Sequence, residues 1–480
     1  MDYILENLEP KAVFKYFEEI SRIPRGSGNE TAVVDYIAAV ASSFGLEYRR
    51  DEADNILVRR KADEGREAAP CVMLQGHTDM VCQCNADTKH NFETDPLDLF
   101  IDDGFIKAKG TTLGGDDGIA CAYMLALLTS EGLELPELEC LFTSSEEVGM
   151  NGAIAFDYSD VKSRLMINLD SEDEGVCVVS CAGGVRAELS FSSEAIDEKN
   201  KLMRIEIKGL CGGHSGVDIN IGHENAILLM AELLDRMYTF EPFNLVSFNG
   251  GTKDNAIPRE SVSVISSPDP DIYKDIISEF INEKKKILSK DEKGFKVHTS
   301  KNKHIGNMFT FADTSRVISA VLGAPNGVIR MSQHIDGLVE TSSNTGIICA
   351  ENGCCKSVHL IRSSSEYSID SAVSKLSRIA KLCSCDIVTR DRYPGWEYMP
   401  DSKLRDMYIK HFEALYGYKP VTEAIHAGLE CGLISSRLPG IDIISIGPDL
   451  DDIHSPDERM DIASVERTWK LLCEMLKAIA

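Results

Sequence analysis

Short apolar runs alternate with helical patterns through the first third of the chain. The runs at 71–75, 139–143 and 165–169 have the length and composition of buried strands. Between them, 30–43 carries apolar residues at helical spacing and 118–128 is a mostly apolar helix candidate. Because strands alternate with helices, we expect an α/β layered domain with a mostly parallel central sheet.

The middle of the chain has a different pattern. Residues 204–208 alternate polar and apolar side chains, as a half-exposed strand does. Further strand candidates lie at 244–248, 261–265 and 358–361, and helix candidates at 225–238, 271–287 and 368–382. This order predicts an α+β unit with helices on one face of a mostly antiparallel sheet.

A proline and glycine break at 391–396 ends this middle part. A helix at 402–416, an apolar strand at 441–446 and a final helix at 464–478 follow it. The chain has 480 residues, which exceeds what one hydrophobic core usually serves. We expect a split α/β domain formed by 1–185 and 393–480, with 186–392 as an inserted α+β domain.

Composition narrows the class of protein. The formal net charge of −27 would repel nucleic acid and anionic membranes, so neither is an expected partner. No apolar run is long enough to span a bilayer, and the first residues lack a secretory signal. The 15 cysteines, an odd number, favour reduced thiols. Together these features predict a cytoplasmic location.

Imidazole and carboxylate side chains gather where the predicted strands end. In chain order they are His77 and Asp79 after 71–75, Asp116 before the helix at 118–128, Glu146 and Glu147 after 139–143, Asp170 after 165–169, and His454 after 441–446. In open α/β sheets, sites form beyond the carboxyl ends of the strands. Crowded carboxylates need a cation to remain ionised, and mixed nitrogen and oxygen ligands suit Zn²⁺, Co²⁺ or Mn²⁺ better than Ca²⁺.

A pair of metal ions accounts for this set. In our hypothesis Asp116 bridges two divalent ions, His77 and Asp170 complete one site, and Glu147 and His454 complete the other. Two ions about 3.5–4 Å apart lower the pKa of a shared water molecule and polarise a carbonyl group. The sequence therefore indicates a hydrolytic centre.

Two carboxylates of this set, Glu146 and Asp79, are not needed as metal ligands. Glu146 adjoins a ligand and can act as the general base that takes a proton from the attacking water. Asp79 can accept the second imidazole N–H of His77 and so fix its tautomer. Taken singly, a His-x-Asp motif or a Glu pair is more often a structural or surface feature. The joint pattern carries the prediction.

The motifs resemble the M20 metallopeptidase family, and within it the aminoacyl-histidine dipeptidases. The stretches that carry the resemblance are GHTDM at 76–80, LGGDDG at 113–118, TSSEEVG at 143–149, NLD at 168–170, GGHSG at 212–216, HAGLECG at 426–432 and IHSPDE at 453–458. The resemblance implies hydrolysis of unblocked dipeptides such as Xaa-His and beta-Ala-His. It also implies two metal ions, most often Zn²⁺, and a homodimer.

The same resemblance assigns residues. His77, Asp116, Glu147, Asp170 and His454 match the metal ligands, Asp79 the orienting carboxylate and Glu146 the base. In the inserted domain, expected to act as a lid or dimerisation domain, His214 matches an oxyanion-stabilising histidine. Asn255 and Arg362 resemble substrate-binding positions, and an arginine would pair with the terminal carboxylate of a peptide. The family often has a cis peptide bond at the position of Asp116-Asp117.

Other functions remain open at this point. An N-acyl-amino-acid deacylase, a carboxypeptidase or a tripeptidase could use the same metal core, because a fold does not determine a substrate. A metal-binding protein without catalysis is a remote alternative, since Glu146 and all five ligands are present. A serine hydrolase elbow is excluded because Val217 replaces the last glycine of G-x-S-x-G. No G-x-G-x-x-G follows a predicted strand.

Overall fold

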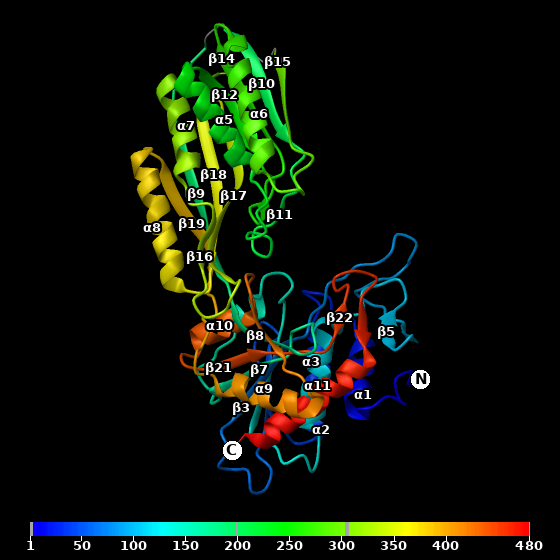
Figure 1. Ribbon diagram of the computed structural model, residues 1–480. Coiled ribbons are helices and arrows are strands. Elements are labelled where there is room, and N and C mark those ends of the chain that lie inside the picture. The colour runs from blue at the N-terminus through cyan, green and yellow to red at the C-terminus, as the bar shows by residue number, and fades with distance from the viewer. Residues whose placement is uncertain (1–2, 195, 198–199, 303–306, 480) are drawn as a thin grey trace. The chain divides into compact units, whose positions relative to one another are not determined.

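The structure, a computed structural model, describes residues 3–194, 196–197, 200–302 and 307–479. The chain divides into two compact units, whose elements Figure 1 labels. Unit 1 consists of Met1–Ser180, Tyr398–Ala424 and Leu429–Ala480, and unit 2 of Cys181–Glu397 and Ile425–Gly428. Within the described part of the chain, no helix is both long and apolar enough to cross a membrane.

An eight-stranded sheet forms the centre of unit 1, in the order β1-β2-β6-β3-β7-β21-β8-β20. Its strands are β1 (Glu47–Arg50), β2 (Ile56–Arg60), β3 (Val72–His77), β6 (Leu138–Thr143), β7 (Leu165–Asn168), β8 (Val176–Cys181), β20 (Val421–Ile425) and β21 (Asp442–Ser445). The four central strands β6, β3, β7 and β21 are parallel, and antiparallel strands extend the sheet on both sides. The predicted α/β class with a parallel central sheet is confirmed.

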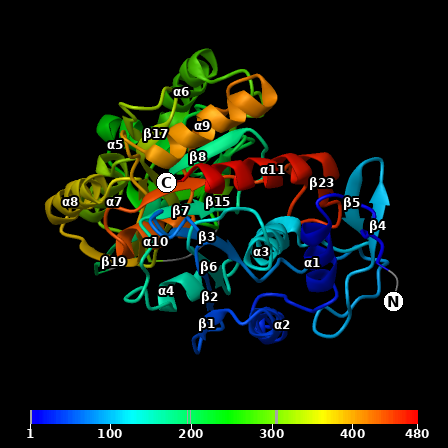
Figure 2. The ribbon, with the colours of Figure 1, turned by 90° about the horizontal axis from the view of Figure 1, so that it is seen from below.

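Helices cover both faces of this sheet. They are α1 (Lys11–Ser21), α2 (Thr31–Ser43), α3 (Gly115–Leu128), α4 (Asn151–Ala155), α9 (Lys403–Tyr416), α10 (Glu430–Arg437) and α11 (Ile462–Ala478). Gly76 of β3 faces α3, since a Cβ atom there would lie 2.5 Å from that of Ala120. The preceding residue points to the opposite face. There, Gln75 contacts Glu430 at the start of α10. Figure 2 shows α9 and α11 lying side by side.

A small antiparallel sheet of unit 1 presents the loop that carries His454. Its order is β22-β23-β5-β4. The strands are β4 (Leu99–Asp102), β5 (Phe105–Ala108), β22 (Leu450–Asp451) and β23 (Arg459–Asp461). His454 lies between β22 and β23 with a φ of +60°, in the left-handed region. This sheet therefore positions His454, the candidate ligand that lies farthest along the chain.

Unit 2 is built on one large antiparallel sheet in the order β15-β10-β14-β12-β17-β18-β9-β19, with β16 paired to β17. The strands are β9 (Gly183–Ser192), β10 (Lys201–Lys208), β12 (Asn244–Gly250), β14 (Ser261–Ser267), β15 (Lys296–Asn302), β16 (Gly327–Met331), β17 (Val339–Glu351), β18 (Cys354–Ser363) and β19 (Asp386–Tyr393). A separate ribbon pairs β11 (Gly213–His214) with β13 (Ala256–Ile257).

The helices of unit 2 pack on one face of this sheet. They are α5 (Ala226–Phe240), α6 (Lys274–Ile287), α7 (Phe311–Gly323) and α8 (Glu366–Leu382), and a 3₁₀ turn at Pro270–Tyr273 precedes α6. On β9, Val185 and Leu189 pack against α8, while Phe191 joins the core under α5, α6 and α7. These odd-numbered residues share one face of the strand. The expected α+β unit with helices on one face is confirmed.

Candidate metal centre

The carboxyl ends of the central strands hold the predicted ligands of unit 1. His77 is the last residue of β3, and Asp116 lies in the first turn of α3. Glu147 follows β6, and Asp170 follows β7. His454 reaches the same place from the loop between β22 and β23. All five side chains therefore converge beyond the carboxyl ends of the parallel strands.

Two groups of three side chains share Asp116. Ligand atoms of His77, Asp116 and Asp170 lie within 4.8 Å of one another, as do those of Asp116, Glu147 and His454. The Asp116 carboxylate uses a different oxygen in each group. Oδ1 is 2.9 Å from His77 Nε2, and Oδ2 is 3.0 Å from His454 Nε2. The carboxylate of Asp116 thus has the geometry of a bridge between two positions.

Two further contacts join ligand atoms within these groups. Asp170 Oδ1 lies 3.5 Å from His77 Nε2, and Glu147 Oε1 lies 2.9 Å from His454 Nε2. The peptide bond between Asp116 and Asp117 is cis, which confirms the expectation from the motif. These contacts place the five side chains in two groups of three that share Asp116.

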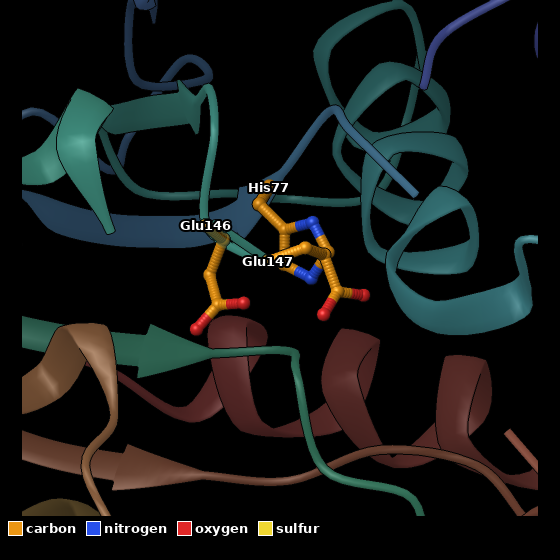
Figure 3. A group of neighbouring side chains, drawn as sticks. All are labelled: His77, Glu146 and Glu147. Carbon is orange, nitrogen blue, oxygen red and sulfur yellow. The ribbon is translucent and has the colours of Figure 1, made fainter. Parts of the chain in front are cut away.

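Glu146 lies close to these groups. Its carboxylate forms a third cluster with the side chains of His77 and Glu147, again within 4.8 Å. Figure 3 shows the two carboxylates on either side of the imidazole, both leaving the segment that follows β6. A base next to the ligands, and absent from both groups that share Asp116, could reach a water molecule held there.

Asp79 has more contacts than its spacing from His77 suggested. His77 Nδ1 lies 3.3 Å from the Asp79 carboxylate and 3.2 Å from its backbone carbonyl. The same carboxylate accepts the backbone N–H of Glu146 at 3.0 Å and of Glu147 at 3.3 Å, and the Ser27 hydroxyl at 2.7 Å. Asp79 therefore links the imidazole to the backbone of the glutamate pair.

Electrostatics at the centre reflect crowded, buried charge. Hydrogen bonds to Asp116 and Glu147 raise the pKa of His454 to about 10. Burial raises the pKa of Asp170 to about 6 and that of Glu146 to about 9, and neighbouring acidic groups add repulsion. The raised pKa values mean that these side chains bind protons readily when no cation is present. Divalent cations bound at the same place would neutralise the carboxylates instead. The donor set of two imidazoles and three carboxylates fits a pair of such ions.

A chain of buried polar side chains runs beneath the ligands, across all four parallel strands. Gln75 Nε2 donates to Glu430 Oε2 at 2.6 Å, and the Thr143 hydroxyl donates to the same oxygen at 2.8 Å. Asn168 Nδ2 donates to Gln75 Oε1 at 2.7 Å. The Ser445 hydroxyl donates to Asn168 Oδ1. We call this the cross-strand chain. Polar residues that interrupt apolar strands were its only signal in the sequence.

His214 lies in unit 2 on the short strand β11. Its Nδ1 accepts the backbone N–H groups of Gly216 at 3.3 Å and Val217 at 3.2 Å, and the backbone N–H of His214 donates to the Asp218 carboxylate at 2.7 Å. Because Nδ1 is an acceptor, the proton of the neutral ring is on Nε2. Burial and the charge of Arg362 lower the pKa of His214. The side chain is therefore a neutral donor through Nε2–H.

Arg362 and Asn255 also belong to unit 2. Arg362 lies on β18 and is 7% exposed, and its Nη1 donates to the Tyr393 hydroxyl at 2.9 Å. Within the described residues its Nε has no acceptor. A buried guanidinium with a free N–H is suited to an anionic ligand. Asn255 is exposed, and its backbone carbonyl accepts the backbone N–H of Ser215 at 2.9 Å.

Comparison with known proteins identifies the class. Residues 73–478 match the model of peptidase family M20/M25/M40, and the chain belongs to this family. The resemblance seen in the motifs is confirmed, and the protein is a peptide hydrolase. Over 479 residues, 99% of either chain, it is 36% identical to the cytosol non-specific dipeptidase of Escherichia coli (strain K12).

Solved structures agree with this assignment. The aminoacylhistidine dipeptidase from Vibrio alginolyticus superposes with a TM-score of 0.95 at 36% identity, covering 99% of this chain and 98% of that one. The aminopeptidase PepT from Bacillus cereus ATCC 10987 has a TM-score of 0.57 at 15% identity, with coverage of 98% and 99%. The second likeness shows that the fold is shared.

Proposed function

We propose that this protein hydrolyses unblocked dipeptides, including Xaa-His and beta-Ala-His, at a centre of two divalent metal ions. The observation that carries the proposal is the Asp116 carboxylate, whose two oxygens face two separate groups of candidate ligands. The full-length similarity to proteins named as dipeptidases supports the substrate class.

In this proposal His77, Asp116 and Asp170 hold one ion, and Asp116, Glu147 and His454 hold the other. Zn²⁺ is the expected metal, with Co²⁺ or Mn²⁺ as alternatives, because the ligand set mixes imidazole nitrogen with carboxylate oxygen. A bound metal pair would lower the pKa of a shared water molecule and polarise the scissile carbonyl.

The chain's own side chains would move the proton and orient the ligands. Glu146 accepts the proton of the attacking water and returns it to the departing amine. Asp79 accepts from His77 Nδ1, which leaves Nε2 of that ring available as a ligand atom. Its bonds to the backbone of Glu146 and Glu147 support a fixed distance between base and ligand.

Three side chains of unit 2 are assigned to the substrate. His214 donates its Nε2–H to the oxygen that becomes negative, a role supported by the two backbone N–H groups on Nδ1. Arg362 pairs with the terminal carboxylate of the dipeptide, a role supported by its buried guanidinium with an unused Nε–H. Asn255 is assigned to substrate binding together with Arg362. The family resemblance assigns unit 2 the role of the lid or dimerisation domain.

A hydrolysis assay tests this function. Metal-reconstituted protein is offered Ala-His, beta-Ala-His, Ala-Ala, a tripeptide and N-acetyl-alanine, each with and without a chelator. We expect chelator-sensitive cleavage of the dipeptides alone. Cleavage of the longer or blocked substrates instead would indicate a tripeptidase or a deacylase, and the absence of activity with any metal would contradict catalysis.

Glu146→Gln is the matching test of the base. The variant should lose most activity while still binding two metal ions per chain, because glutamine cannot accept the proton. Glu139→Gln is the control: this glutamate is also buried but lies at the opposite end of β6. Unchanged turnover in Glu146→Gln would contradict the assignment.

Location and assembly complete the proposal. A cytoplasmic location is supported by the name of the Escherichia coli relative, a cytosol dipeptidase. A homodimer is expected from the family resemblance, and light scattering on the purified protein would measure its mass in solution. A monomer with full activity would rule out any need for a partner subunit.

A further inference from the structure

Glu458 binds the backbone of the loop that carries Asp116. Its Oε2 accepts the N–H groups of Leu113 at 2.7 Å and Gly114 at 3.0 Å. Its Oε1 accepts those of Gly115 at 2.7 Å and Asp116 at 3.4 Å. The side chain is 3% exposed. One buried carboxylate therefore satisfies four consecutive backbone donors.

Two of these donors, the N–H groups of Gly115 and Asp116, lie in the first turn of α3, and those of Leu113 and Gly114 precede the helix. Helix α3 begins at Gly115, and the first N–H groups of a helix have no partner within it. Such a helix start attracts an anion, and here the anion is supplied by Glu458 from the C-terminal part of the chain. Neither Asp116 nor Asp117 has helical backbone angles, so this first turn is not held by regular helix geometry.

The loop is also held through its carbonyl groups. Arg25, which is 2% exposed, donates to the carbonyl oxygen of Gly114 and, at 2.9 Å each, to those of Thr78 and Asp79. Gly114 has a φ of +66°, and a Cβ atom there would lie 2.6 Å from Arg25 Nη2. The backbone before Asp116 is thus held from two sides: the Glu458 carboxylate accepts its N–H groups, and the Arg25 guanidinium donates to the carbonyl oxygen of Gly114.

We propose that Glu458 is a positioning residue of the metal centre: its carboxylate holds the 113–116 backbone so that Asp116 faces both ligand groups. The role rests on the proposed metal binding by Asp116. Glu458 and His454 belong to the same loop between β22 and β23. That loop would then supply one ligand directly and fix the shared ligand through Glu458.

Because both groups contain Asp116, displacement of its loop should weaken the binding of both ions. Partners that orient metal ligands typically contribute about 10–100-fold in metal affinity. We therefore expect Glu458→Gln to bind Zn²⁺ about 10–100-fold more weakly at both positions. The amide retains one acceptor but sets an N–H group against backbone N–H groups.

A second variant separates geometry from charge. Glu458→Asp keeps the negative charge but is one methylene shorter, so it cannot reach all four N–H groups. If position matters, Glu458→Asp also binds Zn²⁺ more weakly than the wild type. If only the charge near the ions matters, Glu458→Asp binds as the wild type does, which would overturn the proposal.

The experiment is a competition titration of metal-free protein with Zn²⁺ and a chromophoric chelator, for the wild type, both Glu458 variants and Glu139→Gln. Glu139 is the matched control, since it is fully buried and accepts the N–H of Ser163 at 3.0 Å away from the ligands. Its variant should bind two ions with wild-type affinity. Circular dichroism of each metal-free protein verifies folding, and Glu458→Asp decides the question if Glu458→Gln does not fold.

Two failures are distinguishable. Folded Glu458 variants that bind two Zn²⁺ ions as tightly as the wild type would overturn the positioning role and leave the proposed function intact. A wild-type protein that binds no Zn²⁺, Co²⁺ or Mn²⁺ would contradict the proposed metal centre itself. Equal weakening in Glu139→Gln would also overturn the role, because the effect would then be general destabilisation.

Discussion

Exchanging the amide of Asn168 with the carboxylate of Glu430, on the two sides of Gln75, should reverse the direction of the two Gln75 hydrogen bonds in the cross-strand chain. Gln75 now donates to Glu430 through Nε2 and accepts from Asn168 through Oε1. Asn168→Asp changes one NH₂ group to an oxygen, so an acceptor then faces Gln75 Oε1 across a distance of 2.7 Å in the parent structure. Rotation of the Gln75 amide would repair that contact but turn its carbonyl oxygen toward the Glu430 carboxylate.

In either orientation of the Gln75 amide, one buried oxygen atom faces another oxygen atom and has no donor. Gln75 is fully buried, and Asn168 and Glu430 are each 1% exposed, so water cannot replace the lost partner. A buried polar group without its partner costs about 1–3 kcal/mol, and more when it is charged. We expect Asn168→Asp to lower the free energy of unfolding of the metal-free protein by about 3 kcal/mol.

Glu430→Gln should relieve this loss. With an amide at 430, the rotated Gln75 donates to Asp at 168 and accepts from the new amide. Residues within one hydrogen-bond network show interaction energies of about 0.5–3 kcal/mol, and we expect about 2 kcal/mol here. The double variant should therefore be more stable than the sum of its two single changes predicts.

Urea unfolding at pH 8 measures all four proteins. Trp469 stacks on Tyr123 in unit 1 at a centroid distance of 6.2 Å, so its fluorescence reports this unit. A common Trp396→Phe background removes the only other tryptophan. Pairing Asn168→Asp with Glu139→Gln should give no interaction energy. If Asn168→Asp lowers the free energy of unfolding equally with Glu or Gln at position 430, the hydrogen bonds of the cross-strand chain do not have the direction described, and the reasoning is refuted.

Three further perturbations have defined outcomes. Burial lowers the pKa of His359 to about 4, so as the pH falls the unfolded chain protonates this imidazole before the folded protein does. The contribution of neutral His359 to the free energy of unfolding is present above pH 6.5, and about 3 kcal/mol of it is lost as the pH falls toward 4. His359→Asn should flatten that decline in urea unfolding, whereas the exposed His298→Asn should not. Gly118→Ala should destabilise unit 1, because the new Cβ would lie 2.5 Å from Arg25 Nη2; wild-type stability would contradict this packing. Adding Zn²⁺ at about 100 times its Kd should stabilise the protein against urea by about 2.7 kcal/mol per site, and a chelator should reverse this.

Local patterns were enough to predict most of the elements near the site. The apolar runs at 71–75 and 139–143 became β3 and β6, each within two residues of the predicted bounds. The predicted helix at 30–43 became α2. These segments are buried or amphipathic along their whole length, so composition and period reveal them. By contrast β17 (Val339–Glu351) was not predicted, because buried Ser, Thr and Asn residues interrupt its apolar pattern.

The site divides in the same way. The candidate ligands could be found because each follows a recognisable strand or glycine turn, and strand ends meet at one edge of a parallel sheet. The contacts of Glu458 and Glu430 could not be predicted, since they join segments far apart in the sequence. Both residues lie in motifs noted from the sequence, but only tertiary structure reveals that one binds backbone N–H groups and the other the Gln75 amide.

The distance along the chain between the candidate ligands has a consequence for biosynthesis. His454 and Asp116 are 338 residues apart, and β21 must insert between β7 and β8 before the sheet is complete. At about 5–20 residues per second, a ribosome needs roughly 20–70 s to span that interval. A nascent chain therefore contains His77, Asp116 and Asp170 long before His454 and Glu458 are synthesised. Occupancy of that second group would mark a chain whose synthesis has passed His454.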